Sequence, residues 1–199
     1  MSTAECTLRE RDPVVVAEAK HRLVLVRHAK SDYPLGVVDH DRPLNARGRR
    51  DAPFIGSWIR DNVPWPEAAP PLILVSSAMR AQLTWALARA GLDDRWRADL
   101  HRDEPRIYDA SADGVSRVIG EIDEDVHTTV VVGHNPAMRD VVEQACVAGE
   151  LRDEATLKYP TSAVAVLATV GPWAGILEGR PQFEIEAFTI PRAPSVPRA

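Results

Sequence analysis

The chain has 199 residues, of which 45% are hydrophobic and 27% are charged, and its formal net charge at pH 7 is −5. A single domain of this length can bury a core without disulfides or metal ions. The acidic balance argues against a general affinity for nucleic acid or an anionic membrane, and no run approaches the roughly 20 apolar residues of a membrane helix.

The predicted domain spans residues 21–190, between an N-terminal extension at 1–20 and a Pro-rich tail at 191–199 that its composition predicts to be disordered. Apolar runs typical of buried strands alternate with helical patterns along this domain. The predicted strands span 22–27, 71–77, 97–102, 128–134, 162–170 and 183–190, and the predicted helices span 45–61, 78–91, 111–122 and 136–149. This alternation predicts an α/β sandwich with a mostly parallel sheet.

Local signals define several of these boundaries. Asn45 is a suitable N-cap for the first helix, although Pro53 predicts a kink or a later start. Gly91 is a stop signal for the second helix, and Pro136 suits the first position of the fourth. The last strand alternates apolar and polar residues, as expected at a sheet edge with one solvated face.

Polar residues follow three of the predicted strands. Arg27 and His28 end the first, Ser76 and Ser77 end the second with Arg80 one turn later, and His134 and Asn135 end the fourth. In open α/β sheets, ligands bind beyond the carboxyl ends of the strands. We therefore expect two histidines and two arginines to meet at one edge of the sheet.

This set of residues suits a phosphoryl group. Arginine offers a permanently charged, bidentate donor, and a neutral imidazole is a competent nucleophile. We expect His28 to attack phosphorus while Arg27, Arg80 and His134 hold the phosphoryl oxygens, and helix starts after Ser77 and Asn135 would add backbone N–H donors. Water would then cleave the phosphohistidine.

Each of these residues also has a structural interpretation. His28 alone could be a hydrogen-bonded core residue, His134 a capping residue and Arg80 a solvated helix residue. Their joint placement at strand ends favours a site over these alternatives. The remaining four histidines are expected in loops or at strand edges.

Two other chemistries lack the necessary context. Cys146 and Arg152 have the C-x5-R spacing of cysteine phosphatases, but Cys146 is expected near a helix C-terminus, where a thiolate is disfavoured. His28 and His134 have no further ligand at zinc spacing, so no metal is expected. Two distant cysteines, Cys6 and Cys146, and the absence of a signal peptide predict a cytoplasmic protein.

The segments LVLVRHAKS, RPLNARG, SSAMRAQLTW, IYDASADG and VVVGHNP resemble the histidine phosphatase superfamily, in particular its small SixA-like phosphohistidine phosphatase branch. The resemblance runs from about Leu23 to Ala145. It implies a three-layer α/β/α sandwich of the phosphoglycerate mutase-like type, without a metal or cofactor. It also implies that His28 accepts the phosphoryl group and that Arg27, Arg80 and His134 complete the pocket, and Asn135 is a further candidate for phosphate binding.

Two departures from the family pattern concern Gln82 and the proton donor. The family's Arg-Ala-x-Gln-Thr turn is here Arg-Ala-Gln-Leu-Thr, with the glutamine displaced by one position. Glu104 is the candidate proton donor, with Asp103 and Asp109 as competitors. A labile P–N bond to an imidazole would make a strong acid less necessary.

The expected function is a metal-independent phosphatase acting on protein phosphohistidine. A phosphatase of a small phosphorylated metabolite and a non-catalytic phosphate-binding module are the alternatives. Short loops around Tyr108 and after Gly149 predict an open site that suits a protein substrate. The expected partners are a phosphorylated protein or small molecule, not nucleic acid or a membrane, and the expected state is a monomer or weak dimer.

Overall fold

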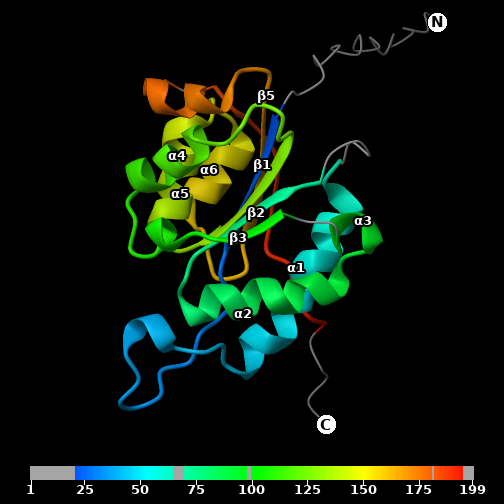
Figure 1. Cartoon of the computed structure of the whole chain (residues 1–199), viewed down its shortest axis with the longest axis vertical. Coiled ribbons are helices and arrows are strands. Elements are labelled where there is room, and N and C mark those ends of the chain that lie inside the picture. Colours follow the sequence, from blue (N-terminus) through cyan, green and yellow to red (C-terminus); the bar gives the residue numbers. More distant parts are fainter. Residues whose placement is uncertain (1–20, 65–69, 98–99, 181, 195–199) are drawn as a thin grey trace, which may run out of the picture.

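The architecture comes from a computed structural model that describes residues 21–64, 70–97, 100–180 and 182–194 (Figure 1). The predicted N-terminal extension and residues 195–199 of the predicted tail lie outside these ranges. No helix within the described ranges is both long and apolar enough to cross a membrane.

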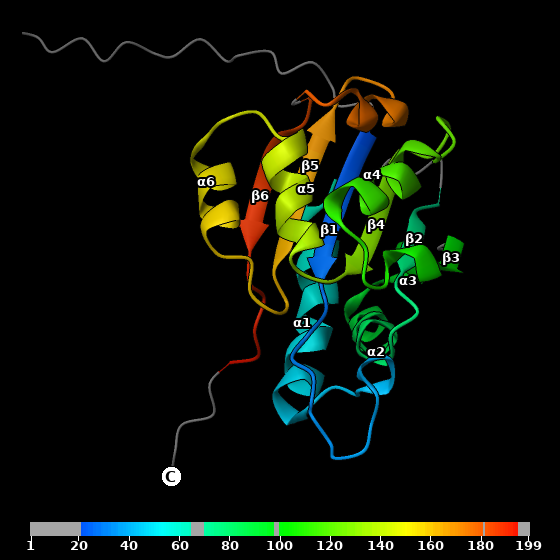
Figure 2. The same ribbon diagram turned by 90° about the vertical axis from the view of Figure 1, so that its left-hand side faces the viewer.

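One six-stranded sheet forms the centre of the molecule, in the order β3-β2-β4-β1-β5-β6. The first four of these strands are parallel to one another, and β5 is antiparallel to both of its neighbours (Figure 2). The predicted mostly parallel sheet is therefore confirmed. The strands are β1 (His21–Arg27), β2 (Leu72–Val75), β3 (Leu100–Asp103), β4 (Thr128–Gly133), β5 (Val164–Thr169) and β6 (Glu184–Thr189).

Helices cover both faces of the sheet and complete the predicted three-layer sandwich. Figure 1 shows α4, α5 and α6 on one side and α1, α2 and α3 on the other. Each face has its own apolar cluster, because alternate residues of the buried strands point to opposite sides. The helices are α1 (Ala46–Asn62), α2 (Met79–Ala88), α3 (Asp94–Arg97), α4 (Ala112–Gly120), α5 (Ala137–Ala145) and α6 (Glu150–Leu157), with 3-10 turns η1 (Asp39–Asp41), η2 (Arg89–Gly91), η3 (Pro105–Ile107) and η4 (Trp173–Glu178).

The predicted helix boundaries hold in most places. Asn45 caps α1 by accepting a hydrogen bond from the N–H of Gly48 at 2.9 Å, and α1 runs through Pro53, so the later start is wrong. Pro136 is the N-cap of α5 rather than its first residue. The segment after Gly149, expected as a short loop, forms α6.

The beginning of the predicted tail is packed. Pro191 is buried, and Arg192 donates to the buried carboxylate of Asp51 on α1 at 2.8 Å. The N–H of Ala193 donates to the same carboxylate at 3.3 Å. These contacts fasten the chain after β6 to the first helix.

The strands that end in the candidate residues are neighbours. Because β4 lies between β2 and β1, their carboxyl ends meet at one edge of the sheet. The ladder continues beyond the strands, since the N–H of His28 donates to Gly133 and that of Ser76 donates to Val132, each at 3.0 Å. The candidate site is therefore built on rigid backbone.

Candidate active site

His28, the first residue after β1, is nearly buried, with 7% of its surface exposed. Its ring Nδ1 lies 2.7 Å from the carbonyl oxygen of Ala29. Because a carbonyl can only accept a hydrogen bond, Nδ1 carries the proton. The lone pair is then on Nε2, which is the atom available for nucleophilic attack.

Thr84 connects the end of β1 to α2. The N–H of Ala29 donates to Thr84 Oγ1 at 2.9 Å, and that hydroxyl donates to the carbonyl of Arg80 at 2.6 Å. Thr84 is 1% exposed, so water does not compete for these bonds. The threonine thus fixes the backbone next to His28 relative to the helix that carries Arg80.

His134 lies next to His28, with 5.0 Å between the ring centroids. Its Nε2 is 2.8 Å from the hydroxyl of Ser76, which also accepts from the N–H of Ala78 at 3.4 Å. When the serine hydroxyl donates to Nε2, the imidazole proton of His134 lies on Nδ1. His134 Nδ1 is buried and has no partner among the described residues, so it is a donor suited to a bound anion.

Two arginines reach the histidines from different elements. Arg27 on β1 donates from Nη1 to the carbonyl of Tyr159 at 2.7 Å, and its Nε is buried without a partner in the part of the chain described. Arg80 on α2 donates to the carbonyl of Asp39 at 2.7 Å and to its Oδ2 at 3.0 Å. Each guanidinium has five N–H donors, more than these bonds use, so both can also bind an oxyanion.

The environment keeps both histidines neutral. Burial lowers the pKa of His28 to about 3, with His134 and the two arginines acting in the same direction against the hydrogen bond to Ala29. Burial also lowers the pKa of His134 to about 4, and the nearby charge of Arg80 adds to this shift. Near pH 7, His28 therefore keeps its nucleophilic lone pair.

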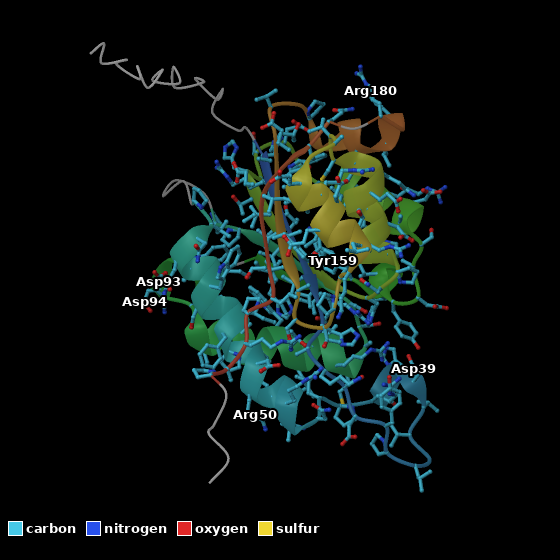
Figure 3. All side chains as sticks on the ribbon, turned by 180° about the vertical axis from the view of Figure 1, so that it is seen from behind. Asp39, Arg50, Asp93, Asp94, Tyr159 and Arg180 are labelled. Carbon is cyan, nitrogen blue, oxygen red and sulfur yellow. The ribbon has the colours of Figure 1, made fainter. Side chains whose placement is uncertain are left out.

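Three residues that the sequence reasoning did not assign form a wall beside these groups. Tyr108 donates from its hydroxyl to Asp39 Oδ2 at 3.2 Å and packs edge-on against the rings of His134 and His40. His40 Nε2 lies 3.1 Å from the hydroxyl of Ser77. Figure 3 labels Asp39, which begins the 3-10 turn η1 in the connection between β1 and α1. The only sequence signal for this wall is its position in or beside the family-like segments IYDASADG and RPLNARG.

Asn135 and Gln82 lie in supporting positions. Asn135 donates from Nδ2 to the carbonyl of Tyr159 at 2.9 Å, the same oxygen that Arg27 contacts. The displaced Gln82 donates to the carbonyl of Ser76 at 2.9 Å and to the carboxylate of Asp103 at 3.0 Å. Gln82 therefore holds the serine that contacts His134, while phosphate binding by Asn135 stays a prediction.

Glu104 has an arrangement unsuited to the predicted proton donor. It is buried, and its carboxylate accepts from the N–H, Nε and Nη2 of Arg106 at 3.1, 2.9 and 2.8 Å. The hydrogen bonds of Arg106 outweigh burial and lower the pKa of Glu104. No contact joins this carboxylate to His28 or His134 among the described residues. Glu104 caps η3, which is a structural role.

The cysteine phosphatase interpretation remains without support. Cys146 is fully buried at the C-cap of α5, and burial raises the pKa of its thiol to about 12, so it has little thiolate character. Arg152, the arginine of the C-x5-R spacing, donates a hydrogen bond to the carbonyl oxygen of Glu143. Within the described ranges no three His, Cys, Asp or Glu side chains cluster as metal ligands.

Several known proteins are similar to this chain in sequence or in structure. No family model matches the chain. "Uncharacterized protein Rv1276c" of Mycobacterium tuberculosis is 38% identical over 158 residues, which cover 77% of this chain and 93% of that protein. A solved structure described as "Putative Phosphohistidine Phosphatase SixA from Nakamurella multipartitia" is 27% identical with a TM-score of 0.71, and the match covers 87% of this chain and 97% of that one. The corresponding structure from Agrobacterium tumefaciens is 28% identical with a TM-score of 0.67, and covers 86% and 98%.

Fold, paired histidines and paired arginines together define the class. The chain belongs to the histidine phosphatase superfamily. Within it, the similarity places the chain in the SixA-like branch. The structural neighbours are phosphatases, which supports a phosphatase activity for this chain.

Proposed function

We propose that the protein hydrolyses phosphohistidine on other proteins, without a metal ion, through a phosphoryl group carried transiently on His28. The observation that carries the proposal is the geometry of His28. A neutral imidazole with its lone pair on Nε2 lies with its ring centroid 5.0 Å from that of a second histidine, and the charges of Arg80 and Arg27 reach it and help to lower its pKa.

The reaction would take place in two steps. In the first, His28 Nε2 attacks phosphorus and the bond from phosphorus to the leaving group breaks, with that electron pair returning to the leaving group. Arg27, Arg80 and His134 Nδ1 would stabilise the phosphoryl oxygens, where charge concentrates in the transition state. In the second step, water attacks phosphorus and the bond to Nε2 breaks, which releases inorganic phosphate and regenerates the free imidazole.

The surface beside the site supports a protein substrate. Tyr33, Leu35, Val37 and Val38 are 68%, 102%, 39% and 64% exposed, on the loop that leads to Asp39. Four exposed apolar residues within six positions form a patch of the kind that marks protein contact sites. A small metabolite would gain no binding energy from these apolar residues. A protein that presents a phosphorylated side chain would bury them in its contact with the loop.

The test is hydrolysis of a phosphohistidine peptide and of p-nitrophenyl phosphate with EDTA present, by the wild type and by His28→Ala. We expect turnover that survives EDTA and falls by at least about a thousandfold in the variant, the effect typical of losing a covalent nucleophile. The Cys146→Ala variant is the matched control and is expected to keep wild-type activity. Stoichiometric phosphate binding without turnover would favour the phosphate-binding module, and activity retained by His28→Ala would contradict the proposal.

A further inference from the structure

The burial of His28 sets the direction in which a leaving group must depart. Phosphoryl transfer places the nucleophile and the leaving group roughly in line, on opposite sides of phosphorus. His28 is 7% exposed, so the opposite side of a bound phosphoryl group faces the open side of the site. The side chains of Asp39 and His40 there are 52% and 41% exposed, and Asp39 contacts the phosphate-binding candidate Arg80 directly.

The carboxylate of Asp39 is held ionised by its neighbours. Oδ1 accepts from Arg42 Nη1 at 2.6 Å, and Oδ2 accepts from Arg80 Nη2 at 3.0 Å and from the hydroxyl of Tyr108 at 3.2 Å. Burial would raise the pKa of Asp39, but the bond from Arg42, the charge of Arg80 and the bond from Tyr108 outweigh it and lower the pKa. A carboxylate offers about four acceptor positions, so one remains beyond these three.

An ionised carboxylate affects two kinds of leaving group in opposite ways. A phosphate ester leaves as an alkoxide or phenolate, whose growing negative charge is repelled and which Asp39 cannot protonate. A phosphoramidate leaves as a nitrogen compound that carries an N–H and a positive charge before the bond breaks. The same carboxylate accepts that hydrogen bond and attracts the part of the positive charge that the nitrogen still carries in the transition state, which raises kcat/KM for the nitrogen-linked substrate.

We infer that Asp39 is a specificity-determining residue, whose carboxylate accepts a hydrogen bond from the leaving group of a nitrogen-linked phosphoryl substrate and so favours P–N over P–O cleavage. The inference rests on the proposed function and assigns the selectivity to one side chain. With a phosphoimidazolium, His28 Nε2 forms the new bond to phosphorus and the P–N electron pair returns to the departing ring nitrogen. The proton on the other ring nitrogen stays in place, next to Asp39, and neutral imidazole leaves without an external acid.

A merely structural role for Asp39 predicts a different result. Asp39 also holds the guanidinium of Arg80, so its loss could misplace a group that binds every substrate. That effect would lower the turnover of P–N and P–O substrates by the same factor. The ratio between the two substrates therefore separates selectivity from positioning.

The experiment compares kcat/KM for a phosphohistidine peptide, phosphoramidate and p-nitrophenyl phosphate in the wild type and in Asp39→Asn. Asparagine keeps the size and an acceptor oxygen but removes the charge. We expect the P–N to P–O ratio to fall about tenfold or more, as for a lost charge-assisted hydrogen bond. Phosphoramidate should show the same fall as the peptide, because it probes the leaving nitrogen without a docking surface.

Asp41→Asn is the matched control, since Asp41 lies on the same turn and pairs with His40 rather than with Arg80. The P–N to P–O ratio of kcat/KM in Asp41→Asn should equal that of the wild type. An equal loss for all three substrates in Asp39→Asn, or an unchanged ratio, would overturn the inference while leaving the phosphatase in place. A wild type that hydrolyses none of the three would instead overturn the proposed function, and the inference with it.

Discussion

At the scale of single residues, the site combines two neutral histidines with an ionised carboxylate. His28 and His134 are neutral because they are buried between two arginines. Asp39 lies farther out and stays ionised because arginines surround it. The same positive charges thus favour a nucleophile at the bottom of the site and a carboxylate at its opening.

The residue that burial makes inert is Cys146. With its thiol pKa raised to about 12, the thiolate fraction at pH 8 is about a thousandfold below that of a free cysteine. We expect a thiol reagent at pH 8 to leave Cys146 unlabelled in the folded Cys6→Ser variant and to label it fully in urea. Rapid labelling of the folded protein would contradict the burial of Cys146, and a thiol-based mechanism would again be a candidate.

At the scale of elements, α1 packs closely against α2, the helix that carries Arg80. A Cβ atom added to Gly56 on α1 would lie 1.8 Å from the backbone oxygen of Ala88 on α2, too close for any side chain. Backbone at a helix contact cannot move aside cheaply, so the two helices would have to separate.

We therefore expect Gly56→Ala to lower the free energy of unfolding by about 2 kcal/mol or more, as overpacked cores do, measured by urea denaturation. Gly114→Ala on α4 is the control, because a Cβ there would meet the Cβ of Ala110 at 3.3 Å and the hydroxyl of Ser111 at 3.8 Å, both side-chain atoms and not backbone. Alanine is the better helix former by up to about 1 kcal/mol, so this variant should be neutral or slightly stabilised. Equal effects in the two variants would contradict the close packing of α1 on α2.

The elements also show how far the sequence could predict the fold. Buried strands such as β1 and β4 are nearly uniform apolar runs, and Asn45 and Ser111 cap helices through their own side chains. Helix α6 was missed because only Ala155 of its eight residues is buried, so it has no apolar stripe to detect. Its residues, ELRDEATL, favour a helix by composition, but without an apolar period this signal is weak.

The same limit explains which parts of the site were predictable. Arg27, His28 and His134 end strands, so strand order alone brings them together. The contacts of Asp39 and Tyr108 could not be predicted, because loops bring them together across 69 residues of sequence. The loop of Asp39 is held by Arg42, whose guanidinium lies 3.4 Å from the ring centroid of Tyr33. The charge of Glu104 suggests a proton donor, but charge alone does not reveal that Arg106, two residues later, donates to its carboxylate.

At the scale of the whole molecule, two buried neutral histidines link the site to stability. Their folded pKa values, about 3 and about 4, lie below the 6.5 of an unfolded chain. At pH values between 6.5 and the folded pKa values, the unfolded state binds more protons than the folded state. The stability that both histidines contribute is therefore complete above pH 6.5 and is lost as the pH falls toward 4.

We expect the free energy of unfolding to fall from pH 7 to pH 5 by up to about 2 kcal/mol for each of these histidines. Urea denaturation at the two pH values measures it, and the window stays above the range in which most carboxylates titrate. His28→Asn and His134→Asn each remove one titrating group, so each variant should lose less stability between pH 7 and pH 5 than the wild type does. If both variants keep the wild-type pH dependence, the two imidazoles protonate normally in the folded protein. His28 would then be neutral at pH 7 because of its ordinary pKa and not because of burial, and it would lose its nucleophilic lone pair as the pH falls below 6.5.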